Sequence, residues 1–158
     1  MEVEWLYVDN KIRINKNDSM DIYSWRENKT RPSYWFKIKP SFNTNYYQIN
    51  FNKKKCSLHR IIYKAHNPEW DIDDNGKLNC IDHINRDSTD NRIENLRVVT
   101  NQQNQFNKNA KGYYWNKKNN KWCARIRIDD KLIQLGHFKK EEDAAIAYLK
   151  AKEIYHKM

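Results

Sequence analysis

Apolar and polar residues alternate along several short segments near the start of the chain. Val8 to Asn15 and Tyr34 to Pro40 both show this alternation, which is typical of half-buried strands. Phe42 to Asn52 continues the pattern across a loop centred on Asn43–Asn45, as expected for antiparallel hairpins. The pattern therefore predicts a β-rich N-terminal region over residues 1–56.

The periodicity becomes helical after this region. Apolar residues recur at helical spacing from Leu58 to Ala65, Ser57 is a suitable N-cap, and Asn67-Pro68 provides a stop signal. Farther along, Leu78 to His83 predicts a short strand, and the residues after it form a long polar loop.

The next elements complete an order of strand, loop, strand and helix. Leu96 to Val99 predicts the second strand, and Thr100 is a good N-cap for the helix that follows. In this order His83 and Asn95 come from the β segments, whereas Asn104 comes from the first turns of the helix. We therefore expect side chains that are distant along the chain to converge on one spot.

The end of the chain alternates strictly over one segment and is helical over another. A strand is predicted at Trp122 to Ile128, between turns at Asn119-Asn120 and Asp129-Asp130, with a further strand at Lys131 to Gly136 and a helix from Glu141 to His156. One face of the central strand comprises Trp122, Ala124, Ile126 and Ile128, and the other comprises Cys123, Arg125 and Arg127. The helix is expected to pack through Ala144, Ala147, Tyr148, Ala151 and Tyr155. These elements predict a three-stranded antiparallel sheet packed on one helix, within an α+β fold.

The charge of the chain favours an anionic partner. The sequence has 30 Lys and Arg against 20 Asp and Glu, a net charge of +10 and a pI near 9.4. Nucleic acid is favoured over a membrane surface, because no apolar run approaches the roughly eighteen residues of a membrane helix. The alternative is a solvated lysine surface that only keeps the protein soluble.

The cysteines predict no zinc site of the paired-cysteine kind. Cys56, Cys80 and Cys123 are dispersed, and no CxxC pair is present. They are typical of reduced thiols in an intracellular protein. A metal site made of His59, His66 and Cys80 is a less favoured alternative to buried thiols and ordinary histidines.

The polar residues around His83 suit phosphodiester hydrolysis. That reaction needs an activated water, a cation on the phosphoryl oxygens and stabilisation of the departing alkoxide. A histidine can take a proton from water near neutral pH, and carboxylate and carboxamide oxygens suit Mg²⁺. A second asparagine can bond the histidine ring and fix its direction. Asp82, His83, Asn95 and Asn104 supply these groups.

This segment resembles the HNH (ββα-metal) nuclease motif, in the His-Asn-Asn variant typical of phage homing endonucleases. The resemblance rests on Asp82-His83, on Asn95-Leu96 and on the closing Asn104, and it extends upstream to the helical segment that begins at Ser57. It implies that His83 is the general base and that Asn95 orients it. It also implies that Asp82 and Asn104 bind Mg²⁺ or Mn²⁺.

Arginines surround this segment. Arg86, Arg92 and Arg97 could clamp phosphates, and Arg97 is the best candidate because it lies between the second strand and the site. The alternative is that they form loop salt bridges. The acidic residues concerned are Asp87, Asp90 and Glu94.

The C-terminal segment resembles the plant ethylene-response-factor (APETALA-type) DNA-binding domain. The match rests on Gly112, W-x-A-x-I at Trp122 to Ile126, L-G-x-F at Leu135 to Phe138, and E-D-A-A-x-A-Y at Glu142 to Tyr148. The resemblance implies a basic sheet that enters the major groove. The residues expected at DNA are Tyr114, Lys117, Lys118, Lys121, Arg125, Arg127 and Gln134.

Tyr114, Asn116 and Gln134 depart from the base-contacting pattern, so no target sequence follows. The alternative for each lysine is a phosphate contact without sequence information, or plain exposure.

The leading hypothesis is a metal-dependent HNH endonuclease of the homing or mobile-element type, which cleaves double-stranded DNA at a recognised site. The expected domains are a β-rich region (1–56), a nuclease core (57–107) and an APETALA-type DNA-binding domain (108–158). We expect no membrane partner, a monomer or weak dimer, and an intracellular location, in the cytoplasm or wherever the target DNA resides. The alternatives are a non-catalytic sequence-specific DNA-binding regulator and a binder of structured RNA.

Overall fold

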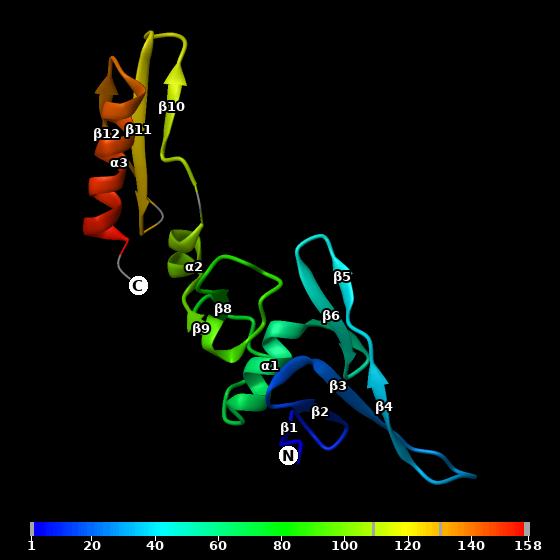
Figure 1. Cartoon of the computed structure of the whole chain (residues 1–158). Helices are drawn as coiled ribbons and strands as arrows, with labels where there is room; N and C mark the ends of the chain where they lie inside the picture. The colour runs from blue at the N-terminus through cyan, green and yellow to red at the C-terminus, as the bar shows by residue number, and fades with distance from the viewer. Residues whose placement is uncertain (1, 109, 130, 157–158) are drawn as a thin grey trace. The chain divides into compact units, whose positions relative to one another are not determined.

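The alternating segments at the start of the chain form two antiparallel sheets (Figure 1). The computed structural model describes residues 2–108, 110–129 and 131–156. A four-stranded sheet has the order β1-β2-β3-β4, and a three-stranded sheet has the order β5-β6-β7. Their strands are β1 (Trp5–Tyr7), β2 (Ile12–Asn15), β3 (Asp18–Arg26), β4 (Tyr34–Ile38), β5 (Ser41–Asn43), β6 (Tyr46–Phe51) and β7 (Lys54–Ser57).

The strand bounds differ from the prediction in one informative place. The segment predicted as a strand from Val8 to Asn15 becomes extended only at Ile12. The cause is Asp9, whose Oδ1 accepts the backbone N–H groups of Lys11 at 2.8 Å and Ile12 at 2.7 Å and so holds a turn. β3 and β7 are strands that the alternation does not predict.

Helix α1 (Leu58–His66) confirms the predicted helix and begins at the expected N-cap, Ser57. Its Arg60 reaches across to the irregular segment that follows the helix. The guanidinium donates to the carbonyl oxygens of Ile72 at 2.6 Å, Asp74 at 3.1 Å and Asn79 at 3.3 Å. The segment between α1 and the next strand is therefore tied to the helix.

The predicted strand, loop and strand are present as a hairpin. β8 (Cys80–His83) pairs antiparallel with β9 (Leu96–Val99), and a short 3₁₀ turn, η1 (Ile93–Asn95), leads into β9. β8 is shorter than predicted. It begins at Cys80, and the predicted first residue, Leu78, is 75% exposed and lies before the strand.

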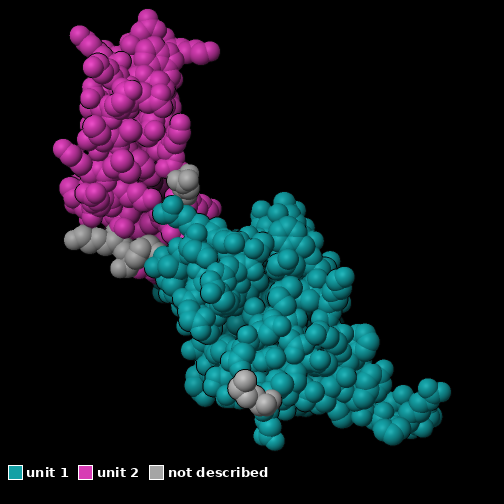
Figure 2. All heavy atoms as spheres, viewed as in Figure 1, with its two compact units in different colours: residues 1–99 teal, residues 100–158 magenta. Residues whose placement is uncertain are grey.

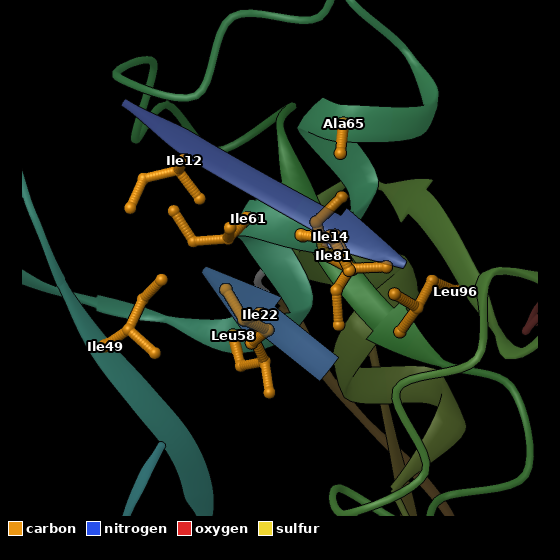
Figure 3. Close-up of a cluster of buried hydrophobic side chains, with 10 residues drawn as sticks. Ile12, Ile14, Ile22, Ile49, Leu58, Ile61, Ala65, Ile81 and Leu96 are labelled. Carbon is orange, nitrogen blue, oxygen red and sulfur yellow. The ribbon is translucent and has the colours of Figure 1, made fainter. Parts of the chain in front are cut away.

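One hydrophobic core joins the N-terminal sheets to this hairpin (Figure 3). Side chains of β2, β3 and β6 pack with those of α1, and the hairpin adds one residue from each strand. The members include Ile12, Ile14, Ile22, Ile49, Leu58, Ile61, Ile62, Ala65, Ile81 and Leu96. The first 56 residues therefore support the hairpin directly, because burying these side chains stabilises both regions together.

The chain divides into two compact units, residues 1–99 and residues 100–158, each of which is described by itself (Figure 2). The second unit begins with α2 (Asn101–Asn107), which has the predicted N-cap. The Thr100 Oγ1 accepts the N–H of Gln103 at 3.1 Å, and the Gln103 Oε1 accepts the N–H of Thr100 at 2.9 Å. This reciprocal capping box satisfies N–H groups that the helix itself leaves unpaired.

A three-stranded antiparallel sheet and a helix follow, which confirms the predicted α+β fold class. The elements are β10 (Tyr113–Asn116), β11 (Lys121–Ile128), β12 (Lys131–Phe138) and α3 (Glu141–Tyr155). Asn120 has a φ of 46° in the predicted first turn. Asp129, with a φ of 47°, lies in the second turn, and its predicted companion Asp130 lies outside the described residues.

The core of the second unit lies between the sheet and α3. Ile126 on β11 packs with Tyr148 and Ala151 on α3, as predicted. Gly112 is required by this packing, since a Cβ added there would lie 2.0 Å from carbons of the Tyr148 ring.

Two predicted faces in this unit need correction. Cys123 was expected beside the exposed arginines of β11 but is only 1% exposed, because it lies on the central strand between its partners Tyr114 and His137. Tyr155 was expected on the buried side of α3 but is 50% exposed, because it ends the helix beyond the last buried position, Ala151. No helix within the described ranges has both the length and the apolar character needed to cross a membrane.

Candidate active site

His83 ends strand β8 and is almost completely buried, with 6% of its surface exposed. Its Nε2 lies 3.1 Å from the Oδ1 of Asn91, which is itself 3% exposed. The other amide atom of Asn91, Nδ2, donates to the carbonyl oxygen of Thr89 at 3.3 Å. The ring of the proposed general base is therefore fixed by a carboxamide from the loop between β8 and β9.

Two further rings enclose His83. His59 of α1 contacts it edge-on, with ring centroids 5.1 Å apart, and Tyr46 of β6 stacks on it with centroids 6.1 Å apart. Tyr46 and His59 also contact each other, at 5.0 Å. Rings from a hairpin and a helix that precede β8 in the chain thus restrict the orientation of the imidazole.

His59 is held in its neutral form. Burial, together with the nearby charges of His83 and Arg60, lowers its pKa from 6.5 to about 3. Its Nδ1 is buried and has no hydrogen-bond partner in the structure. A neutral ring beside His83 does not repel a proton that arrives on His83, because it carries no charge of its own.

Asp82 precedes His83 and points to the opposite face of β8. It is 5% exposed, and its Oδ2 accepts hydrogen bonds from Arg97 Nε at 3.0 Å and Arg97 Nη2 at 2.8 Å. The two residues are direct partners in the β8–β9 register. Arg97 was predicted to contact phosphate, and in the structure its guanidinium binds the carboxylate predicted to hold the metal.

Asn95 closes the loop between the two strands. Its Oδ1 accepts the backbone N–H of Asn85 at 2.9 Å, and its Nδ2 donates to the carbonyl oxygen of Asp90 at 2.8 Å. Its own carbonyl accepts the N–H of Ile84 at 2.9 Å. These two bonds tie the Asn95 side chain to the loop, and its predicted action on His83 remains a prediction.

An ion pair stiffens the same loop. Arg92 donates from Nε and Nη2 to the two carboxylate oxygens of Asp90, at 2.9 Å and 2.8 Å, and Asn85 Nδ2 also donates to Asp90 at 2.9 Å. The Arg92 guanidinium holds the pKa of Asp90 well below its usual range. This geometry favours the salt-bridge interpretation of Arg92 over phosphate contact. Arg86 has a φ of 67° in the same loop.

Asn91 is the functional residue that the sequence interpretation missed. It lies in a stretch with several asparagines and aspartates, and the spacing of the motif does not show which carboxamide meets the histidine. The only sequence signal is that Asn91 lies four positions before Asn95 in the polar loop. That signal becomes informative only when the folded loop is known.

The predicted second metal ligand, Asn104, lies on α2, where its backbone N–H bonds the carbonyl oxygen of Thr100 at 2.9 Å. A carboxylate and a carboxamide oxygen are hard donors that fit Mg²⁺, which usually keeps several waters and binds few protein groups. Among the described residues, no cluster of three or more His, Cys, Asp and Glu side chains could hold a metal. The alternative set of His59, His66 and Cys80 therefore does not form such a cluster.

The residues predicted to contact DNA lie on the sheet and turns of the second unit. Arg125 is exposed and stacks over the ring of Tyr114, with its guanidinium carbon 4.8 Å from the ring centroid. Gln134 uses its amide to donate to the carbonyl oxygens of Ala124 at 3.1 Å and Gly136 at 3.0 Å, beside an irregularity in the sheet register. The other basic residues predicted to contact DNA are exposed as well; they are Lys117, Lys118, Lys121 and Arg127.

Comparison with known proteins identifies the family of the hairpin region. Residues 56–106 match the HNH endonuclease family. Over 117 residues, the chain is 32% identical to an uncharacterized HNH endonuclease of Acanthamoeba polyphaga mimivirus. That alignment covers 69% of this chain and 58% of the viral protein, so the chain spans little more than half of that relative. No solved structure matches the chain. The segment from Cys56 to Phe106, which carries the buried His83 and its partners, therefore forms a domain of the HNH endonuclease family.

Proposed function

We propose that this protein is a divalent-metal-dependent DNA endonuclease, which hydrolyses phosphodiester bonds with His83 as the general base. The observation that carries this proposal is the buried imidazole of His83, next to Asp82 in β8 and held through Nε2 by a carboxamide, inside an HNH endonuclease domain. Such a ring is fixed in direction before substrate binds, which is what proton abstraction from an attacking water requires.

The chemistry assigned to the chain is a proton transfer coupled to attack on phosphorus. His83 takes a proton from water, the resulting hydroxide attacks the phosphorus, and the bond to the 3′ oxygen breaks. Asp82 and Asn104 would hold Mg²⁺ or Mn²⁺, which supplies charge stabilisation for the phosphate and the leaving oxygen when it is bound. Arg97, whose Nη2 lies 2.8 Å from Asp82 Oδ2, would be available to bind a phosphate once that carboxylate binds a cation.

Recognition of DNA is assigned to the second unit. Its sheet presents Arg125 over Tyr114, with further exposed lysines at the turn between β10 and β11. A narrow basic sheet of this kind can enter the major groove, while lysines in turns contact phosphates. The close fit of Gly112 against Tyr148 supports the resemblance to the APETALA-type domain, in which this unit sets the register on DNA. We accordingly propose the homing or mobile-element type of nuclease.

A plasmid assay tests the proposal. Supercoiled plasmids that carry a genomic library are incubated with the full chain and Mg²⁺, with EDTA in a parallel reaction, and mapping of the cleaved inserts identifies the target. We expect cleavage that EDTA abolishes, that His83→Ala abolishes and that His66→Ala retains. His66 ends α1, whereas His59, at its start, is the histidine of this helix that contacts the His83 ring. Binding of His83→Ala to the target, measured by gel shift, should stay near that of the wild type.

The same assay separates the competing functions. One catalytic site cuts one strand, so a monomer is expected to give nicked plasmid, whereas linear product would indicate a dimer or two successive cuts. Specific binding without cleavage in Mg²⁺ or Mn²⁺ would instead support the non-catalytic regulator. Poor competition by duplex DNA would support a binder of structured RNA.

A further inference from the structure

We propose that Asn91 is a positioning residue that fixes the tautomer of His83, with the ring proton on Nε2 and the lone pair on Nδ1. The inference rests on the proposed function only in that it gives His83 the role of general base. It names the atom that takes the proton and the side chain that selects this atom.

The first step is the orientation of the Asn91 carboxamide. Its Nδ2 donates to the carbonyl oxygen of Thr89 at 3.3 Å, and its Oδ1 lies 3.1 Å from Nε2 of His83. A carboxamide flipped by half a turn would place Oδ1 against the Thr89 oxygen, where two acceptors would repel each other. Because Asn91 is only 3% exposed, water cannot readily reach the mismatched groups and bond them instead, so the flipped orientation would be costly. The carbonyl end of the amide therefore faces the histidine.

The second step is the tautomer. A carboxamide oxygen only accepts hydrogen bonds, so the ring nitrogen that faces it must carry the proton. A neutral imidazole has a single N–H, and the lone pair then resides on Nδ1. In the proposed reaction Nδ1 is the atom that accepts the proton of water.

The third step is what happens when His83 becomes charged. The bond between Nε2 and Asn91 Oδ1 persists in the imidazolium and becomes a charge-assisted hydrogen bond, which is the stronger kind. Asn91 thereby stabilises the protonated ring without taking a proton itself. His59, which is neutral and in edge contact with the same ring, adds no opposing charge.

The fourth step is how the loop holds Asn91. The residue before it, Asp90, is fixed by Arg92 through its carboxylate and by Asn95 Nδ2 through its carbonyl oxygen, at 2.8 Å in both contacts. Asn95 therefore acts on His83 indirectly, because it holds the backbone next to Asn91, and Asn91 contacts the ring. This explains how Asn95 supports the histidine while its own side chain bonds the loop.

The direct test is ¹⁵N NMR of the histidine side chains in the full chain at mildly alkaline pH, with the His83 signals assigned by their loss in His83→Ala. We expect the wild type to show His83 protonated on Nε2. Asn91→Leu, which is similar in volume but cannot accept a hydrogen bond, should give a mixture or the other tautomer. A wild-type spectrum with the proton on Nδ1 overturns the proposal, and this result requires no variant to fold.

Matched variants separate positioning from loss of structure. Asn79→Leu alters an asparagine that is also buried, at 9% exposure, but whose bonds go to Trp70, Asp71 and Asp74. Asn79→Leu should leave the His83 tautomer unchanged, even if the variant unfolds at a lower temperature than the wild type. Asn91→Asp loses the bond to Thr89 but keeps an acceptor for Nε2, and it should restore the wild-type tautomer. If Asn91→Leu and Asn79→Leu alter the His83 signals equally, the proposal is wrong.

Kinetics gives the second readout. Asn91→Leu should lower kcat by about 10- to 100-fold, the usual effect of losing a partner that orients a reactive group, with KM for DNA nearly unchanged. Asn91→Asp should recover much of that loss. The two proposals fail separately. Cleavage by His83→Ala at the wild-type rate would refute the general base and leave the tautomer assignment intact, whereas an Nδ1–H ring would refute only the role of Asn91.

Discussion

Arg97 donates two hydrogen bonds to one oxygen of Asp82, across the β8–β9 hairpin, at 3.0 Å from Nε and 2.8 Å from Nη2. The carboxylate proposed to bind a cation is thus paired with an arginine in the protein alone. A bound cation would compete with this arginine for Asp82, since both are attracted to the same charge. In the proposed mechanism, a guanidinium released from Asp82 would be available to bind the substrate phosphate.

This pairing predicts an effect of Mg²⁺ on the stability of an Arg97 variant. Arg97→Met removes the positive charge that faces the buried Asp82, so the variant should melt at a lower temperature than the wild type. Mg²⁺ can replace that charge, and it should therefore raise the Tm of Arg97→Met more than it raises the Tm of the wild type. Thermal unfolding with and without Mg²⁺ measures both values.

The matched control for that measurement is Arg92→Met, which breaks an ion pair with Asp90 in the same hairpin loop. Its Tm should respond to Mg²⁺ as the wild type does, because Asp90 is not a proposed metal ligand. Equal Mg²⁺ shifts for Arg97→Met and the wild type would contradict competition at Asp82.

The lowered pKa of His59 predicts that the first unit loses stability in acid. Its pKa is about 3 in the folded protein against an ordinary value of 6.5, so below pH 6.5 the unfolded chain binds a proton that the folded chain does not. The stabilising contribution is present above pH 6.5 and decreases as the pH falls toward 3, by on the order of 1 kcal/mol per pH unit. His59→Leu removes this dependence, since leucine does not titrate.

Urea unfolding at about pH 7 and about pH 5 checks this prediction. The difference in unfolding free energy between the two pH values should be larger for the wild type than for His59→Leu. The carboxylates with lowered pKa, such as Asp90, contribute equally to both proteins and cancel in the comparison. His66→Leu is the control, since His66 is less buried and should give a smaller change.

Gly112→Ala should destabilise the second unit. The added Cβ would lie 2.0 Å from ring carbons of Tyr148, which is 8% exposed and packed against Ile126. Overpacking of this kind costs about 1–3 kcal/mol. NMR spectra should show loss of dispersion for signals of residues after 100, while those of the first unit remain.

A compensating variant tests the cause. Gly112→Ala combined with Tyr148→Leu removes the ring that the new methyl group would meet. The double variant should be more stable than the sum of the two single changes predicts, because the residues are in contact. Strict additivity would show that Gly112 is needed for another reason.

The position of Arg125 over Tyr114 predicts how the second unit binds DNA. Arg125→Ala should weaken binding to the target more than Lys118→Ala does, because Arg125 lies on the sheet stacked over Tyr114, whereas Lys118 lies in a turn. Lys118→Ala should reduce the salt dependence of binding by about one charge and weaken all sequences alike. Gel shifts over a range of salt concentrations, with target and unrelated duplexes, distinguish the two effects. Equal losses on both duplexes for Arg125→Ala would assign it to phosphate contact.

The sequence by itself determined the elements whose signals are local. The alternation before His83, the N-cap at Thr100 and the strand from Trp122 are each encoded by neighbouring residues, because strand and helix periodicity depends on residues only a few positions apart. The ordered motif around His83 also identified the region that the HNH family comparison matches.

Only the tertiary structure decided which side chains surround His83. Tyr46 and His59 reach its ring from β6 and α1, and Asn91 was selected from several nearby carboxamides by the path of the loop. Such contacts depend on how separate elements pack and on side-chain rotamers, and neither is recorded in the spacing of residues along the chain. The same reason explains why the sequence suggested a phosphate for Arg97, whereas the folded hairpin places it against Asp82.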